Sequence, residues 1–402
     1  MTDTLAQTPA DPVHPASAAL HPSRGALPSV AMMSTYPPTQ CGLATFAAAL
    51  SNALGEAGVT RLGVIDVADT APGTRDQRVV ATLTPSLSSR LEVARIINSH
   101  DVLVVQHEFG IFSGEDGVDL MHLLADVHVP VVATLHTVPL EPSARQRAIL
   151  EELGRRCDAL VTMTVEAHDR YVRIYDVDER KVSVIPHGAT VPDQRGLPQG
   201  GPVSLLTWGL LGPGKGVEWV VDALAMAPEL RGHVRYTVAG QTHPKVLRAD
   251  GEKYREMLQR RVRFLGIADM VTFDNSYRDV PSLMELIQES HCVVLPYDSQ
   301  DQITSGVLVD ALVAGRPVIA TRFPHAVELL SRGVGLTVPQ ADPVAMAAAI
   351  RMVVKQPQML SAMSNATEPI AREHRWSTVA NQYLALGARA ARERTAVAHG
   401  DL

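Results

Sequence analysis

Four glycines and one lysine stand together in the stretch WGLLGPGKGVEWVVDAL, between an apolar run and a helical pattern. A permissive backbone, a helix N-terminus and one positive charge favour a phosphate site. The spacing nearly satisfies the Walker A pattern, but a glycine occupies the position of the Ser or Thr that holds magnesium, which weakens the hypothesis of a metal-dependent NTPase. A glycine-rich turn with a solvated lysine is the structural alternative. The group consists of Gly209, Gly212, Gly214, Lys215 and Gly216.

A second polar segment lies in CVVLPYDSQDQITSGVLVDALVAG, where an apolar strand leads through a loop into a short helix. Ser305 suits the N-cap of this helix, and Gly306 leaves the first-turn N–H groups open to an anion. Asp310 stands about one turn further along, among apolar positions. It either accepts hydrogen bonds from vicinal hydroxyls, as a ribose presents, or pairs with a Lys or Arg. The loop before the helix adds three polar side chains: Asp301, Gln302 and Thr304.

The two segments together indicate one kind of ligand. In open parallel sheets, ligands bind beyond the carboxyl ends of strands, and both segments follow strands. Two anion sites on the same side suit a diphosphate, and the carboxylate of Asp310 suits a diol. We therefore expect a nucleotide diphosphate here. The residues expected around its phosphates and the attached group are Gly214, Lys215, Gly216, Thr304, Ser305 and Gly306.

The first half of the chain also places candidate residues after strands. Gly42 begins a helix, either as a tight turn or as a backbone that approaches a ligand. His107 and Glu108 either bind a hydroxyl-rich ligand or only satisfy each other. His136 stands at a strand end, which favours a role in the site over a purely structural one. His187 lies at the mouth of a linker, where a domain-boundary contact is favoured over ligand contact.

Apolar runs alternate with helical patterns throughout the chain, which indicates parallel sheets covered by helices on both faces. The predicted strands are 29–34, 62–67, 102–106, 130–136, 159–164 and 182–188 in the first half, and 203–209, 234–240, 270–273, 292–297 and 316–321 in the second. The fold class is therefore α/β, with two Rossmann-like parallel-sheet domains facing a central cleft. Such a cleft is a favoured place for a small-molecule site.

Composition divides the chain into segments, because Ala, Pro, Thr and Ser dominate the start and Gly and Pro the middle. The expected segments are a disordered tail at 1–25, an N-terminal domain at 26–190, a linker at 191–202, a nucleotide-binding domain at 203–375, and a helix at 376–392 that crosses back to the first domain.

Charge and composition exclude several classes of protein. The net charge of −7 indicates no nucleic-acid partner. No apolar run approaches the roughly 18 residues of a membrane span, and no signal peptide is evident. Cys41, Cys157 and Cys292 are far apart and odd in number, so neither a disulfide framework nor a metal knuckle is indicated. A cytoplasmic setting follows, with peripheral contact at the inner membrane surface left open.

As an ordered set, these segments resemble the retaining glycosyltransferases of family 4, which have the GT-B fold. The resemblance runs from Ser29 to Tyr383 and is far more specific as a set than any single motif. It is carried by STYPPTQCGLATFAAAL, QHEFGIF, TLHT, VIPHG, GLLGPGKG, AGQTHP, SGVLVDALVAGRPVIAT and RWSTVANQY.

The resemblance implies roles for residues on the donor side. Lys215 matches the lysine that binds the donor diphosphate, but the arginine usual five positions earlier is Leu210 here. Asp310 matches the second of two acids and would hold the ribose. The first acid, which would hold the donor sugar, falls at Gln302, with Asp301 as its neighbour. His136 matches the family histidine near the reacting sugar, and Gly42 matches the first-loop glycine.

The activity implied is transfer of a hexose, mannose or glucose, from a nucleotide-diphosphate sugar such as GDP-mannose or UDP-glucose. The acceptor would be a hydroxyl of a lipid, glycan or metabolite, the anomeric configuration would be retained, and no cofactor or divalent metal would be needed. Asp176 and Asp178 imitate a metal-binding Asp-x-Asp but are expected to be turn residues. Two alternatives remain: a non-catalytic nucleotide-sugar-binding protein and a sugar-nucleotide epimerase.

Overall fold

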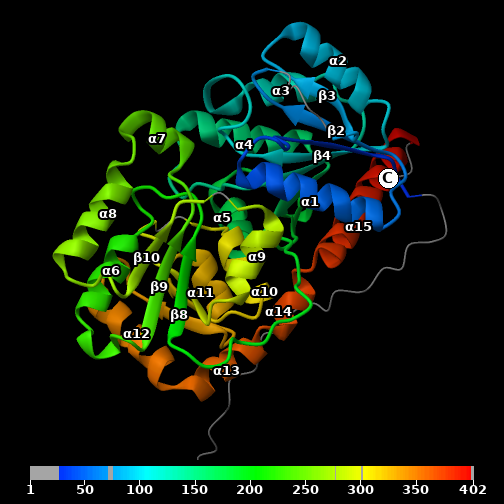
Figure 1. The fold of residues 1–402 in the computed structure, drawn as a ribbon. Helices are drawn as coiled ribbons and strands as arrows, with labels where there is room; N and C mark the ends of the chain where they lie inside the picture. The colour runs from blue at the N-terminus through cyan, green and yellow to red at the C-terminus, as the bar shows by residue number, and fades with distance from the viewer. Residues whose placement is uncertain (1–26, 71–75, 277, 300–301, 400–402) are drawn as a thin grey trace, which may run out of the picture.

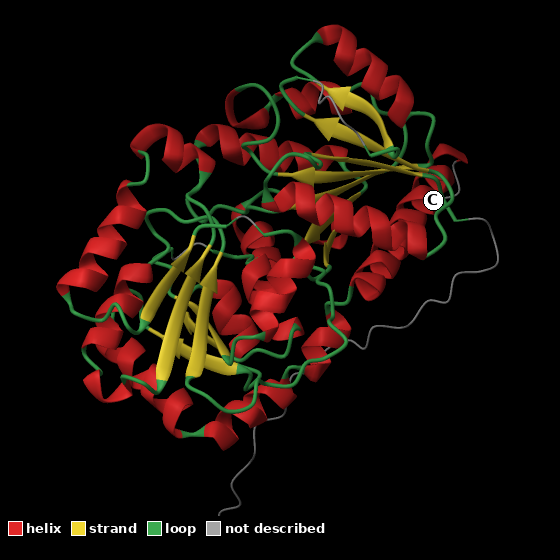
Figure 2. Cartoon of the chain, viewed as in Figure 1, coloured by secondary structure: helices red, strands yellow, loops and turns green. Residues whose placement is uncertain are grey.

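The computed structural model describes residues 27–70, 76–276, 278–299 and 302–399, and the predicted tail at 1–25 lies outside them. Two α/β domains, each built on a parallel sheet, account for these residues, as predicted from the alternation of strands and helices (Figure 1). Each sheet lies between layers of helices (Figure 2).

The N-terminal sheet has seven parallel strands in the order β3-β2-β1-β4-β5-β6-β7. Its strands are β1 (Val30–Ser34), β2 (Leu62–Val67), β3 (Val79–Leu83), β4 (Val102–His107), β5 (Val131–Leu135), β6 (Ala159–Thr162) and β7 (Val182–Val184). Its helices are α1 (Gly42–Glu56), α2 (Leu87–Ile97), η1 (Glu115–Gly117), α3 (Asp119–Leu124), α4 (Ala144–Arg156), α5 (Val165–Ile174) and η2 (Glu179–Lys181).

The second sheet has six parallel strands in the order β10-β9-β8-β11-β12-β13. Its strands are β8 (Val203–Trp208), β9 (Val234–Ala239), β10 (Val271–Asp274), β11 (Cys292–Leu295), β12 (Val318–Thr321) and β13 (Gly335–Val338). Its helices are α6 (Val217–Ala225), η3 (Pro228–Leu230), α7 (Pro244–Asp250), α8 (Lys253–Phe264), α9 (Val280–Gln288), α10 (Gly306–Val313), α11 (Pro324–Leu330), α12 (Pro343–Lys355), α13 (Pro357–Ala366) and α14 (Glu368–Glu373). The last helix is α15 (Trp376–His399).

Two strands are absent from the sequence-based prediction, β3 and β13. Each stands at one edge of its sheet. Most of their residues are only partly buried. The prediction missed β3 although it has the same five residues, VVATL, as the predicted strand β5. By contrast, β13 is short and begins with a glycine, so its sequence gives only a weak strand signal.

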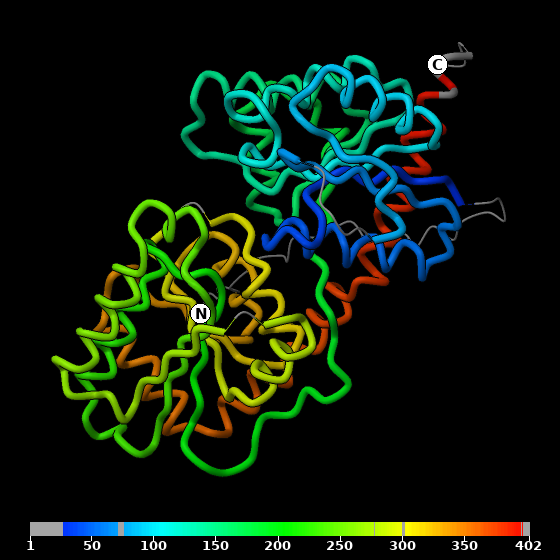
Figure 3. Tube along the Cα trace, turned by 45° about the horizontal axis from the view of Figure 1, so that its top comes forward, coloured from blue at the N-terminus to red at the C-terminus, as the bar shows by residue number. Residues whose placement is uncertain are grey.

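The C-terminal helix α15 packs on the N-terminal domain. It contacts α1, β5 and β6, and Val379, Ala380 and Tyr383 join the core of that domain. The hydroxyl groups of Tyr383 and Thr134 lie 2.8 Å apart, which ties the helix to β5. The helix continues to His399, beyond the end predicted near residue 392. Figure 3 shows the chain around the linker and the start of α15 crossing between the domains side by side, and an isolated bridge joins Ala189 to Arg375, just before these two elements.

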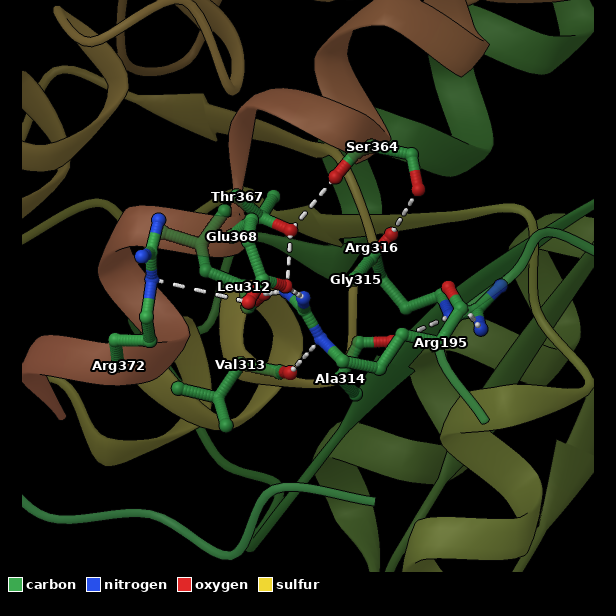
Figure 4. A network of polar contacts seen from close by, with 10 residues as sticks. All are labelled: Arg195, Leu312, Val313, Ala314, Gly315, Arg316, Ser364, Thr367, Glu368 and Arg372. Atoms are coloured by element: carbon green, nitrogen blue, oxygen red, sulfur yellow. Dashed lines mark hydrogen bonds and ion pairs between the residues drawn. The ribbon is translucent and has the colours of Figure 1, made fainter. Parts of the chain in front are cut away.

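The linker is fastened to the second domain by two arginines (Figure 4). Arg195 Nε donates to the carbonyl of Val313 at the end of α10 (2.8 Å), and its guanidinium also pairs with Glu368. The buried Arg316 donates from Nη2 to the carbonyl of Gly196 (2.7 Å). Because guanidinium groups satisfy several carbonyl oxygens at once, these two arginines hold the linker against the second domain.

Within the described ranges, no helix combines the length and the apolar composition needed to cross a bilayer.

Candidate active site

The glycine-rich loop lies between β8 and α6, and its conformation requires glycine. Gly214 and Gly216 have φ angles of 85° and 66°, a region that side chains rarely adopt. A Cβ on Gly216 would lie 1.7 Å from the carbonyl oxygen of Pro296. The amide of Asp298 donates to the carbonyl of Gly214 (3.0 Å). The loop is therefore pressed against the segment that follows β11.

Lys215 meets that same segment through its side chain. Its Nζ lies 4.5 Å from the centre of the Tyr297 ring, within the range of a cation–π contact. Burial lowers the pKa of Lys215, and no carboxylate among the described residues pairs with it. Burial raises the pKa of Tyr297 to about 12, and a hydrogen bond with the Ser305 side chain opposes that rise. Tyr297 thus lies between the lysine loop and the start of α10.

The N-terminus of α10 is capped as the sequence predicts. Ser305 Oγ accepts from the amide of Leu308 (3.3 Å). The first-turn amides have no acceptor inside the helix. A Cβ on Gly306 would lie 3.0 Å from His187 Nε2, so His187 of the first domain faces this helix start. The position therefore has little space for any residue larger than glycine.

Asp310 has neither an ion pair nor a hydrogen bond from its carboxylate within the described part of the chain. Burial raises its pKa to about 7. The alternative in which a described Lys or Arg neutralises this carboxylate does not hold. An unpaired, partly buried carboxylate is costly unless a ligand donates hydrogen bonds to it.

The loop before α10 is held from both domains. Gln302 Nε2 donates to the carbonyl of Thr304, whose own hydroxyl oxygen is buried without a partner among the described residues. Ile303 packs into the hydrophobic core of the N-terminal domain. Asp301, the second candidate for the sugar contact, lies outside the described residues.

Glu108 and His107 follow β4 but do not bond to each other. The Thr137 hydroxyl and the Phe109 amide (3.0 Å) donate to the Glu108 carboxylate. Burial nevertheless raises the pKa of Glu108. His107 is fully buried beside Phe109. Neither of its ring nitrogens has a partner in the described structure, and burial lowers its pKa to about 4. Mutual satisfaction of the two side chains is therefore wrong.

His136 has a fixed orientation at the end of β5. Its Nε2 lies 2.8 Å from Gln106 Oε1, and since an amide oxygen only accepts, Nε2 carries the proton. Nδ1 is then free to accept a hydrogen bond. Burial lowers the pKa of His136 to about 3, and Phe46 of α1 packs edge-on against the ring at 5.0 Å.

Two other sequence candidates have simple placements. Gly42 begins α1, and a Cβ there would meet no atom within 4 Å, so this turn leaves open space in front of the helix. Asp178 caps the short helix η2 and pairs with Arg180, as expected of a turn residue. Over the described ranges, no cluster of three or more His, Cys, Asp or Glu side chains could hold a metal ion.

Two residues at the site received no role from sequence. Tyr297 follows the end of strand β11, but it belongs to no recognisable sequence motif. Lys245, at the start of α7, extends toward the first domain: its Nζ is 3.8 Å from where a Cβ of Gly110 would lie. Burial lowers the pKa of His243, and the charges of Lys245 and Lys215 lower it further, so the two cations act on one region. Proximity of this kind depends on the packing of segments that are distant in sequence, so residue spacing could not reveal it.

Family models match both domains. A model described as Glycosyltransferase Family 4 matches residues 41–191, and one described as Glycosyl transferases group 1 matches residues 202–356. Together they span all the candidate residues named above.

Curated relatives agree with these models. The chain is 27% identical over 281 residues to a D-inositol 3-phosphate glycosyltransferase of Streptomyces avermitilis, which covers 66% of this chain and 58% of the relative. A protein of the same name from Geodermatophilus obscurus is 29% identical over 261 residues, which covers 58% of this chain and 56% of the relative. The chain thus spans less than two thirds of the length of these relatives.

Solved structures show the same fold. HepE from Anabaena, crystallised with UDP, superposes with a TM-score of 0.69 at 19% identity, covering 88% of this chain and 98% of HepE. Sucrose-phosphate synthase from Thermosynechococcus elongatus gives a TM-score of 0.70 at 19% identity, covering 92% and 99%. With a family match in each domain and these structural neighbours, the chain belongs to the family 4 (group 1) glycosyltransferases and has the GT-B fold.

Proposed function

We propose that this chain is a retaining glycosyltransferase that moves a hexose from a nucleotide-diphosphate sugar to a hydroxyl acceptor. One observation carries the proposal: Lys215, which has no ion pair among the described residues, and the N-terminus of α10 meet around Tyr297. A cation and a helix start that share one location form a site for a diphosphate.

The donor side offers groups for the diphosphate and for the ribose of a nucleotide diphosphate. Lys215 and the first-turn amides of α10 would hold the phosphates. Asp310, without a partner in the described structure, would accept hydrogen bonds from the ribose hydroxyls. UDP-glucose and GDP-mannose are the donors to test, with UDP-glucose first because HepE was also crystallised with UDP-glucose.

Lys245 is our candidate for the positive charge missing at Leu210. Its ammonium group lies close to Gly110, and it acts electrostatically on both Glu108 and His243. A flexible lysine at this place would reach a diphosphate held by Lys215 from the opposite side. The donor would then have two cations supplied by different loops.

In the reaction we propose, the acceptor oxygen bonds to the anomeric carbon while the bond from that carbon to the phosphate oxygen breaks. The acceptor proton passes to the departing phosphate oxygen, on the same face. Lys215 and the helix amides stabilise the negative charge that grows on the leaving group, each worth a few kcal/mol in sites of this type. His136, whose Nδ1 carries no proton, would orient a sugar hydroxyl. No step needs a divalent metal, so activity should persist in EDTA.

The acceptor would lie against the N-terminal domain, where Glu108 and His107 follow β4. Glu108 is held by two hydrogen bonds and can accept further ones from hydroxyl groups. Because the curated relatives are named D-inositol 3-phosphate glycosyltransferases, inositol 3-phosphate is the first acceptor to test.

The experiment is a two-stage screen. Thermal shifts across sugar nucleotides identify the donor, since a ligand at 100 times its dissociation constant stabilises by about 2.7 kcal/mol. Acceptors are then screened by release of the nucleotide diphosphate, and NMR of the product gives the anomeric configuration. Inversion of configuration, or no stabilisation by any sugar nucleotide, would contradict the proposal.

A non-catalytic nucleotide-sugar-binding protein is the second candidate. The observations that favour it are Gln302 at the position of the first acid and Leu210 at the position of the arginine. Tight donor binding without release of nucleotide diphosphate, over a broad range of acceptors, would support this second function.

A further inference from the structure

His325 holds both ends of the turn at residues 302–305, which carries the candidate donor contacts. It stands in the first turn of α11, directly after β12, and its side chain is 1% exposed. Its Nδ1 accepts from the amide of Ser305 at 2.9 Å. Its own amide lies 3.4 Å from the carbonyl of Gln302 and donates to it. One residue on a neighbouring helix is therefore bonded to the first and last residues of this turn.

The hydrogen bond fixes the tautomer of the ring. An amide N–H only donates, so Nδ1 of His325 carries no proton and Nε2 carries it. Burial lowers the pKa of His325 to about 3, and the nearby His374 and His187 act in the same direction. The ring is therefore neutral near pH 7, and its acceptor stays available throughout the working range of most enzymes.

The turn has few other supports of its own. It contains no helix or strand, and within it Gln302 Nε2 bonds to the carbonyl of Thr304. Ile303 anchors the turn to the N-terminal domain. Ser305 is 4% exposed, so without His325 its amide would be buried with no acceptor, and the chain would have to shift to satisfy it.

We propose that His325 is a positioning residue for the donor: through the Ser305 amide and the Gln302 carbonyl it sets the turn that contacts the donor sugar and phosphates. This inference rests on the proposed function, because it assumes that the turn binds a sugar nucleotide. His325 itself need not touch the donor. Its contribution is the orientation of Gln302, Ser305 and the N-terminus of α10.

The same domain offers a matched control. His291 Nδ1 accepts from the amide of Ser204 at 3.1 Å, which is the same type of bond between a histidine and a serine amide. His291 precedes β11 and Ser204 lies near the start of β8, so this bond stands at the amino ends of the strands, away from the candidate site. A general loss of stability would affect both histidines, whereas a positioning effect is confined to His325.

The experiment compares His325→Asn, His325→Gln and His325→Ala with His291→Ala in the full chain, using the donor found by the thermal-shift screen. Asn places a carbonyl oxygen near the position of Nδ1, whereas Gln places one near Nε2. We expect Asn to keep the donor KM within about threefold of wild type. Gln and Ala should raise it about tenfold to a hundredfold, the range for a displacement of about 1 Å. The acceptor KM should stay unchanged in all variants, and His291→Ala should keep the wild-type donor KM.

The outcomes separate the two proposals. A wild-type chain that turns over no sugar nucleotide would refute the function and leave the bond to be checked by ¹⁵N NMR of the His325 ring. A wild-type chain that turns over, with Asn and Gln variants alike in donor KM, would overturn the positioning role. If His325→Ala does not fold, the donor KM of His325→Asn compared with that of His325→Gln still tests the positioning role.

Discussion

Two candidate groups of the N-terminal domain, Glu108 and His136, are held by hydrogen bonds, whereas two of the second domain, Lys215 and Asp310, are not. In the N-terminal domain, Glu108 is held by Thr137 and the Phe109 amide, and His136 is held by Gln106. In the second domain, the described structure gives the Lys215 ammonium group only an aromatic ring. It gives the carboxylate of Asp310 no partner at all.

This difference indicates which side depends more on its ligand. Groups tied to their own domain are already oriented and lose little when substrate is absent. Unpaired charges in a partly buried site are unfavourable until a ligand of opposite or complementary polarity arrives. The second domain should therefore gain the most stability from a nucleotide sugar, and the N-terminal domain should mainly orient the acceptor.

The largest effect is expected from Lys215→Ala. The variant removes the cation that would stabilise the departing diphosphate, so kcat/KM should fall about 10²- to 10³-fold. The melting temperature should change little, because the described structure shows no ion pair at Lys215. Lys355→Ala, at the exposed end of α12, is the control. Near-normal turnover in Lys215→Ala would contradict its role and weaken the contrast between the domains.

Asp310 should give the site a pH dependence. Its pKa is raised from 3.8 to about 7 by burial. This group therefore stabilises the fold fully below pH 4, and the contribution is lost as the pH rises through 7. Asp310→Asn should match wild type near pH 4 and be more stable at pH 8, by at most about 4 kcal/mol for a rise of about three pKa units. Denaturant unfolding at the two pH values measures this difference.

Donor binding should depend on pH in the opposite direction. The ionised carboxylate of Asp310 accepts ribose hydroxyls better than the protonated form, so affinity for the nucleotide should rise about tenfold from pH 6 to pH 8. Asp310→Asn should bind more weakly at pH 8 and lose this dependence. Calorimetry at the two pH values tests it, and a wild-type affinity that does not change between them would count against ribose contact.

The sequence predicts the central strands of both sheets and the segments that follow them, because continuous apolar runs and glycine-rich turns are local signals. The segments around Lys215 and Ser305, expected at one location, lie together in the structure. The edge strand β13 is short and begins with a glycine, so this signal is weak there, whereas β3 carries the same residues as β5 and was missed. The hydrogen bond from Ser305 to His325 joins residues of different elements. The lack of a described partner for Asp310 is a property of packing. Neither feature could be predicted from the spacing of residues in the sequence.

Glu108→Gln should separate the acceptor side from the donor side. Gln keeps the size of the side chain but replaces one acceptor oxygen by a donor NH₂ group, so it cannot accept from both the Thr137 hydroxyl and the Phe109 amide in the same way. We expect the acceptor KM to rise roughly tenfold, about the value of one hydrogen bond to a charged group. The donor dissociation constant should stay within about twofold. A change in donor binding as large as that in acceptor binding would break the proposed division between the domains.

The smallest effect tests how the two sides are held together. Glu328 of α11 accepts from the amides of Val165 (3.2 Å) and Glu166 (3.3 Å) at the start of α5, so one domain caps a helix of the other. Glu328→Ala should cost about 0.5–2 kcal/mol, as for other helix caps. Because it loosens the approach of the domains, it should also raise the hydrolysis of the donor relative to transfer. Glu229→Ala, which breaks an ion pair inside the second domain, should leave that ratio unchanged. If the ratio of hydrolysis to transfer is the same in both variants, the Glu328 cap contributes to stability alone. Other contacts would then bring the candidate groups of the two domains together.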